Sequence, residues 1–240
     1  MRDELAIERY LARYAEQDTT AAPVPVEPWR QVLVLPAYRE SAAVLDRLAQ
    51  LGKSGSCLVI LVLNRPEQES DPEANRELRG AVAALPAASA NGVAIHRLCA
   101  GLDVFPLDLD RRRGALPRAQ AVGLARKAGM DTALAWCAAG AIDSQWLCTT
   151  DADTTLPADY FDSLQALHGD APLATFPFRH VPGPDQACNR ALGVRLEFMT
   201  AGSSPRRSLN RRSSCGVSPI SGTSTRAWPP SPSTFSISVM

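Results

Sequence analysis

The sequence lacks the features that mark several large classes of protein. No stretch approaches the roughly eighteen uninterrupted apolar residues of a membrane span, and residues 1–17 lack the apolar core of a signal peptide. None of the six cysteines belongs to a C-x-x-C pair, which favours reduced, buried thiols over zinc ligands or disulfides. We therefore expect a cytoplasmic protein without a transmembrane segment.

Acidic side chains are missing from one end of the chain. None follows Glu197, so residues 201–240 carry a net charge of +5 and residues 1–200 carry −5. The last forty residues hold twelve serines, five prolines and five arginines, too little periodic apolar content to offset the entropy of ordering them. We expect a disordered tail.

Two origins of this tail stay open. A basic tail conventionally binds nucleic acid or a membrane surface. However, only two lysines stand against 23 arginines, as in a GC-rich coding sequence, and GC-rich DNA translated out of frame yields Ser, Arg and Pro. We therefore favour a frameshift or truncation near Thr200 and expect no nucleic-acid partner.

Short apolar runs predict an α/β fold. Residues 31–35 (QVLVL) form one run, which ends at the loop 36–41 (PAYRES) and is followed by a helical pattern. Residues 57–63 (CLVILVL) form a second run, long enough for a strand buried on both faces and followed by Asn64. Such strands, joined by a crossover helix, predict an open, mostly parallel sheet flanked by helices, with ligands beyond the carboxyl ends of the strands.

A third apolar run ends in a pair of carboxylates. Residues 146–150 (WLCTT) lead directly into Asp151 and Asp153. Two hard oxygen ligands at a strand tip suit a divalent cation that also holds phosphate oxygens, as in transfer from a nucleotide-activated donor. The alternative is that the two aspartates mark the solvated turn that ends a strand.

Three motifs together resemble a known family. The strand ending in residues 35–40 (LPAYRE), the segment 123–131 (GLARKAGMD) and the strand ending in 151–153 (DAD) are similar, in order and spacing, to inverting glycosyltransferases of family 2, which have the GT-A fold. The resemblance covers roughly residues 30–200. It implies a Rossmann-like, nucleotide-binding sheet and sugar transfer with inversion from a nucleotide-sugar donor to an acceptor hydroxyl.

The resemblance also implies roles for individual residues. Asn64 stands where the family usually has an acidic residue near the nucleobase. Mn²⁺ or Mg²⁺ is expected at Asp151 and Asp153, with His180 as a third ligand from a later segment. The residues expected to contact the nucleotide-sugar are Pro36, Ala37, Tyr38, Glu40, Asn64, Arg126 and Asp151.

The general base of the reaction has no evident candidate. In the family, an acidic pair well downstream of Asp-x-Asp supplies it, whereas only Glu197, in a predicted helix, is available here. We therefore expect that the protein with this sequence does not catalyse sugar transfer. The acceptor stays unknown. A non-catalytic nucleotide-sugar-binding module is one alternative. A nucleotidyltransferase is another, although the chain has no glycine-rich phosphate loop.

The predicted organisation has three parts. Residues 1–28 form an N-terminal helix and linker, residues 29–200 the incomplete nucleotide-sugar-binding domain, and residues 201–240 the disordered or out-of-frame tail. A helix is expected from about Pro117 to Cys137, with Val122, Ala125, Gly129 and Ala133 on its packed face. The arginine-rich stretch 108–114 is interpreted as a solvated, self-paired loop or as a mobile loop that presents arginines to phosphates.

Overall fold

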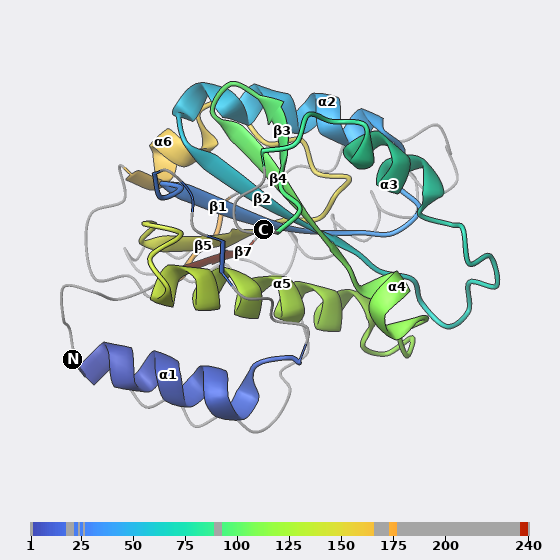
Figure 1. Cartoon of the computed structure of the whole chain (residues 1–240), viewed down its shortest axis with the longest axis horizontal. Helices are drawn as coiled ribbons and strands as arrows, with labels where there is room; N and C mark the ends of the chain where they lie inside the picture. Colours follow the sequence, from blue (N-terminus) through green and yellow to red (C-terminus); the bar gives the residue numbers. More distant parts are fainter. Residues whose placement is uncertain are drawn as a thin grey trace, which may run out of the picture. The chain divides into compact units, whose positions relative to one another are not determined.

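The computed structural model describes residues 2–17, 22–23, 25, 27–88, 93–165, 173–176 and 236–239, all within one compact unit. They form an α/β fold, with helices on both faces of one sheet (Figure 1). The elements, in chain order, are α1 (Arg2–Tyr14), β1 (Gln31–Ala37), α2 (Ala43–Ala49), the 3-10 helix η1 (Gln50–Ser54), β2 (Cys57–Leu63), α3 (Arg76–Ala83), β3 (His96–Cys99), β4 (Leu102–Asp108), α4 (Leu109–Arg113), α5 (Ala121–Ala138), β5 (Trp146–Thr149), α6 (Tyr160–Gln165), β6 (Leu173–Ala174) and β7 (Ser236–Val239).

The sheet is mostly parallel, as the sequence predicts. Its strand order is β3-β4-β2-β1-β5-β7-β6, and β3 alone among these strands runs antiparallel to its neighbour. β1 lies between β2 and β5, and every residue of β1 and β2 is buried. Strands that are apolar on both faces need cover on both faces, which fixes a layered arrangement.

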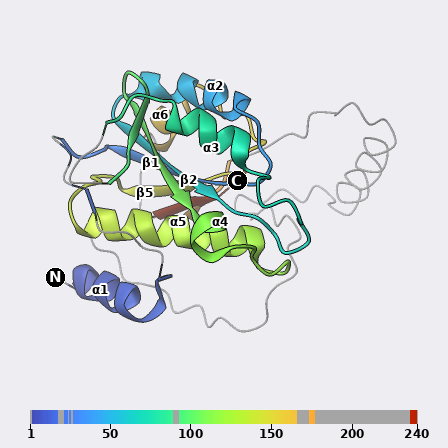
Figure 2. The ribbon, with the colours of Figure 1, turned by 45° about the vertical axis from the view of Figure 1, so that its right-hand side comes forward.

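Successive residues of the central strands point into two separate cores. In β2, Val59 and Leu61 join the core under α2, α3 and α6, whereas Leu58 and Ile60 join the core under α5. Figure 2 shows these helices on opposite sides of the sheet, with α1 outside α5. The two-residue period of a strand thus divides one apolar run between two layers.

Helix α5 buries three of the four residues expected on its packed face, Ala125, Gly129 and Ala133, whereas Val122 is 50% exposed, which corrects that part of the expectation.

Helix α5 crosses the sheet very closely at Gly129. A β-carbon there would lie 2.4 Å from Val34 Cγ1 and 2.8 Å from Val62 Cγ2. Both valines are fully buried in β1 and β2. The approach of α5 to the sheet therefore depends on the missing side chain at this position.

Helix α1 is fixed to α5 by a buried carboxylate. Asp131 is 2% exposed and accepts hydrogen bonds from Tyr10 Oη (2.9 Å), the Glu16 backbone N–H (2.8 Å) and Lys127 Nζ (2.7 Å). Lys127 Nζ also donates to the carbonyl of Tyr14, at 2.5 Å. Lys127 is thus engaged with the N-terminal segment.

The arginine-rich stretch forms the end of β4 and one short helix, α4. Asp108 caps α4 by accepting a hydrogen bond from the Arg111 backbone N–H at 3.1 Å, so the stretch is partly self-paired. Asp110 is buried and accepts from Arg65 Nε (2.8 Å) and Arg79 Nη2 (3.2 Å). These pairs anchor α4. The strand end and the helix correct the prediction of a loop.

The end of the chain corrects the predicted tail in one place. Residues 236–239 form β7, which pairs in parallel with β5 and β6. Four residues of alternating serine and apolar or β-branched side chains (SISV) suit a strand. The rest of the predicted tail lies outside the described residues. Over the part of the chain that is described, no helix combines the length and the apolar character needed to cross a membrane.

Candidate functional site

The carboxyl ends of β1, β2 and β5 meet at one edge of the sheet. Ala37 pairs with Leu63, and the Asn64 backbone N–H donates to the Ala37 carbonyl at 3.1 Å. On the other side of β1, the Thr150 backbone N–H donates to the Val34 carbonyl at 3.2 Å. The structure thus brings together the segments that follow all three strands, including Asn64 and the Asp-x-Asp motif. We call this region the carboxyl edge.

Pro36 and Ala37 belong to β1 itself, and Tyr38 begins the loop. Tyr38 Oη donates to Glu69 Oε2 at 2.6 Å, and Arg39 Nη1 donates to the same oxygen at 3.1 Å. Burial and the hydrogen bond to Glu69 raise the pKa of Tyr38, whereas that hydrogen bond lowers the pKa of Glu69. The loop after β1 is therefore pinned to Glu69, a residue that no sequence motif indicated.

Two buried polar atoms at the carboxyl edge have no hydrogen-bond partner among the described residues. They are Asn64 Oδ1, after β2, and Thr150 Oγ1, after β5. Both residues are 1% exposed. Buried polar side-chain atoms are rarely left unpaired in folded proteins, so each of these two atoms calls for a partner beyond the described residues, and a ligand can supply one.

The Asp-x-Asp motif lies in the turn that follows β5, and both aspartates are exposed. Asp151 Oδ1 forms an ion pair with Arg126 Nη2 of α5, and Arg126 Nε donates to Thr149 Oγ1 at 3.3 Å. Asp151 is the residue predicted to hold a cation, and Arg126 the one predicted to hold phosphate. The structure places them side by side, where each neutralises the other.

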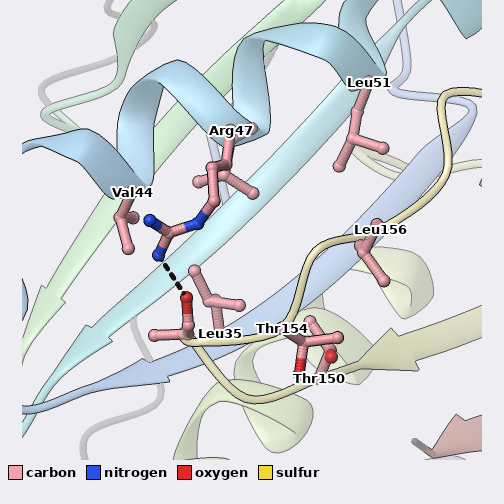
Figure 3. A pocket seen from close by; sticks show the side chains of 9 residues that line it. Leu35, Val44, Arg47, Leu51, Thr150, Thr154 and Leu156 are labelled. Atoms are coloured by element: carbon pink, nitrogen blue, oxygen red, sulfur yellow. Dashed lines mark hydrogen bonds between the residues drawn. The ribbon is translucent and has the colours of Figure 1, made fainter. Parts of the chain in front are cut away.

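The loop that carries Asp153 is tied to α2. Arg47 Nη2 donates to the Ala152 carbonyl at 2.7 Å, across a small pocket that this loop, α2 and β1 enclose (Figure 3). Burial raises the pKa of Glu40, the positive charge of Arg47 opposes that shift, and the negative charge of Asp153 adds to it. The pocket is lined by Leu35, Val44, Arg47, Leu48, Leu51, Thr150, Ala152, Thr154 and Leu156.

The raised pKa of Glu40 predicts a pH-dependent stability difference for Glu40→Gln. A raised folded-state pKa contributes stability that is present below the unfolded-state pKa and is lost as the pH rises through the folded-state pKa. We expect the midpoint of thermal unfolding of the variant to rise relative to the parent between about pH 4 and pH 7. A midpoint difference that stays constant across this range would contradict the shift.

The residues at this edge match a hard divalent cation in kind. Asp151 and Asp153 offer carboxylate oxygens, the ligands that Mg²⁺ and Mn²⁺ prefer. Within the described ranges, no group of three or more His, Cys, Asp or Glu side chains is placed to hold a metal. His180, the predicted third ligand, lies outside the described residues, as does Glu197.

Comparison of the chain with protein-family models, curated proteins and solved structures found no match. The likeness to family 2 glycosyltransferases therefore depends on the three sequence motifs quoted above. Of the predicted nucleotide-sugar contacts, the structure describes all seven, and they follow or end β1, β2 and β5 or project from α5.

Proposed function

We propose that the protein binds a nucleotide-sugar donor at the carboxyl edge and acts as an inverting glycosyltransferase of the family 2 type. The observation that carries this proposal is the pair of unpartnered atoms, Asn64 Oδ1 and Thr150 Oγ1. Both follow strands at the edge where open α/β sheets bind their ligands, and Thr150 directly precedes the Asp-x-Asp motif. A ligand at this edge would give a reason for polar groups that are otherwise buried at a cost.

The described residues fit distinct parts of such a donor. Asn64 Oδ1 can accept a hydrogen bond from a base N–H, and Tyr38, which follows the neighbouring strand β1, offers an aromatic ring. Arg126 carries a guanidinium group, which matches phosphate oxygens in paired hydrogen bonds. A divalent ion held by Asp151 and Asp153 would neutralise the charge that develops on the departing diphosphate.

The Arg126–Asp151 pair implies an exchange of partners on binding. In the ligand-free protein the two side chains satisfy each other. A donor diphosphate would draw Arg126 away from Asp151 and leave that carboxylate for a cation. Because the side chain of Asp151 is 56% exposed and that of Arg126 26% exposed, separating them costs little.

The transfer step itself needs one further group. The bond between the anomeric carbon and the diphosphate oxygen breaks, and the acceptor oxygen bonds to that carbon from the opposite side. The proton of the acceptor hydroxyl passes to a carboxylate base. No acidic side chain follows Glu197, which favours a second candidate function, a nucleotide-sugar-binding module without transfer activity.

Calorimetry with Mn²⁺ and a panel of nucleotide sugars tests the proposal. We expect heat of binding for at least one donor and only when the metal is present. Released nucleoside diphosphate in the same samples would support the transferase, and heat without product would support the binding module. If no nucleotide sugar gives heat with or without Mn²⁺, both functions are excluded.

A further inference from the structure

Asn75 makes hydrogen bonds to three separate segments, two at the carboxyl edge and one in α4. Its Oδ1 accepts from the Arg39 backbone N–H at 3.0 Å, after β1. Its Nδ2 donates to the Asn64 carbonyl at 3.0 Å, after β2, and to Asp110 Oδ2 at 3.2 Å, after β4. Asn75 is 1% exposed, so these bonds are shielded from water.

The chemistry of the partners requires an amide at this position. The Arg39 N–H needs an acceptor, whereas the Asn64 carbonyl and the Asp110 carboxylate both need donors. An aspartate would offer no donor, and its charge would face the carboxylate of Asp110. A leucine of similar size would remove the bond from Asn75 to all three groups, of which Asp110 would keep its bonds from Arg65 and Arg79.

Asn75 gives up a local role to make these bonds. It is the N-cap residue of α3, where an asparagine side chain usually accepts a hydrogen bond from its own helix. Here the side chain makes no cap bond to α3. The side chain therefore serves the carboxyl edge and not the helix that it precedes.

The bond to Arg39 supports an uncommon backbone conformation. Arg39 has φ of +55°, in the left-handed region that residues other than glycine rarely adopt. Tyr38 precedes it and Glu40 follows it, both predicted contacts of the nucleotide-sugar. The conformation of Arg39 thus sets the direction of the loop backbone at Tyr38 and Glu40.

We propose that Asn75 is a positioning residue that holds the loops after β1 and β2 and the helix α4 in the arrangement that the nucleotide needs. The part of this inference that concerns the nucleotide rests on the proposed function. The part that concerns the loops does not, because the three hydrogen bonds exist without a ligand.

Asn75→Ser separates the two roles of the side chain. A serine hydroxyl is a good N-cap for α3 but is too short to bridge the three segments. We expect faster amide hydrogen exchange at Arg39, whose N–H loses its acceptor, in the variant without ligand. We also expect affinity for UDP or GDP with Mn²⁺ to fall about tenfold or more, since the bonds lost include one to a buried charge.

Trp29→Phe is the matched control. Trp29 Nε1 donates to Asp103 Oδ2 at 2.9 Å, a buried side-chain bond next to the amino end of β1, so its loss lowers stability without touching the carboxyl edge. We expect this variant to keep parental exchange at Arg39 and parental nucleotide affinity. If Trp29→Phe loses as much nucleotide affinity as Asn75→Ser does, the loss reflects lower overall stability and the proposal is overturned.

Asn75→Asp, combined with Asp110→Asn, is the second test. In the double variant the amide of the new asparagine at position 110 can donate to the new carboxylate at position 75. The double variant should therefore recover part of the nucleotide affinity that Asn75→Asp loses. Unchanged exchange at Arg39 in both Asn75→Ser and Asn75→Asp overturns the positioning role, whether or not the parent binds a nucleotide. Faster exchange with a parent that binds no nucleotide supports the role in the loops and refutes the proposed function.

Discussion

Replacing Asp151 and Asp153 together by Asn should weaken Mn²⁺-dependent binding of a nucleoside diphosphate at least about 100-fold. Groups that only orient metal ligands contribute about 10- to 100-fold to metal affinity, so the loss of two charged ligands should cost no less. The amide keeps the shape of each side chain but removes the charge that holds a hard cation. Isothermal calorimetry with and without Mn²⁺ measures the change.

Asp143→Asn is the control for this double variant. Asp143 forms an ion pair with Arg30 near the amino end of β1. The side chain of Arg30 is 70% exposed and that of Asp143 is 68% exposed. Asp143 precedes β5, whereas the Asp-x-Asp turn follows it. The substitution therefore removes an exposed carboxylate at the other end of that strand, and nucleotide affinity should not change. If the double variant binds a nucleoside diphosphate with Mn²⁺ as tightly as the parent does, the metal assignment is wrong.

Gly129→Ala should lower the free energy of unfolding by about 1–3 kcal/mol, although alanine is the better helix former. The new methyl group would lie 2.4 Å from Val34 Cγ1 and 2.8 Å from Val62 Cγ2. Both contacts are closer than carbon atoms can approach, so α5 must move away from the sheet or the valines must leave their rotamers. Urea denaturation at fixed pH measures the loss.

Two further variants test whether the loss of stability comes from crowding between α5 and the sheet. Gly123 lies on the same helix with nothing within 4 Å of its β-carbon position, so Gly123→Ala should stabilise the protein, by up to about 1 kcal/mol. Adding Val34→Ala to Gly129→Ala should recover part of the stability, because the two changes share one space. Similar effects of the two glycine substitutions would refute the close approach of α5.

The strands show what an apolar pattern can and cannot predict. The run 57–63 became β2 with the predicted bounds, because a strand buried on both faces is apolar throughout. β1 continues through Pro36 to Ala37, beyond the predicted end. Its pairing with β5 stops at Val34, so Pro36 has a strand partner on one side only and its missing N–H is tolerated.

β4 was not predicted, because polar and proline residues interrupt its pattern. Asp103 lies within this strand, yet its carboxylate is buried against Trp29 Nε1 and paired with Arg97. Pro106 also falls inside the strand. Partners from distant parts of the chain make such residues acceptable, and a local pattern contains no information about those partners.

The candidate site was likewise predicted in part from the sequence. The sequence motifs predicted which strand ends carry polar groups, and parallel pairing placed those groups at one edge. Glu69 and Asn75 were not predicted, since each lies in a polar segment without a motif and acts on residues at least 11 positions away. The pairing of Arg126 with Asp151 likewise depends on how α5 crosses the sheet.

The attachment of α1 has a consequence for the order of events during synthesis. Tyr10 and Glu16 bind Asp131, which lies 121 and 115 residues further along the chain. At a translation rate of about 5–20 residues per second, α1 leaves the ribosome on the order of ten seconds before its binding partner is made. An amphipathic segment that waits so long is open to chaperones and to other nascent chains. Helix α1 therefore cannot dock until Asp131 has been synthesised.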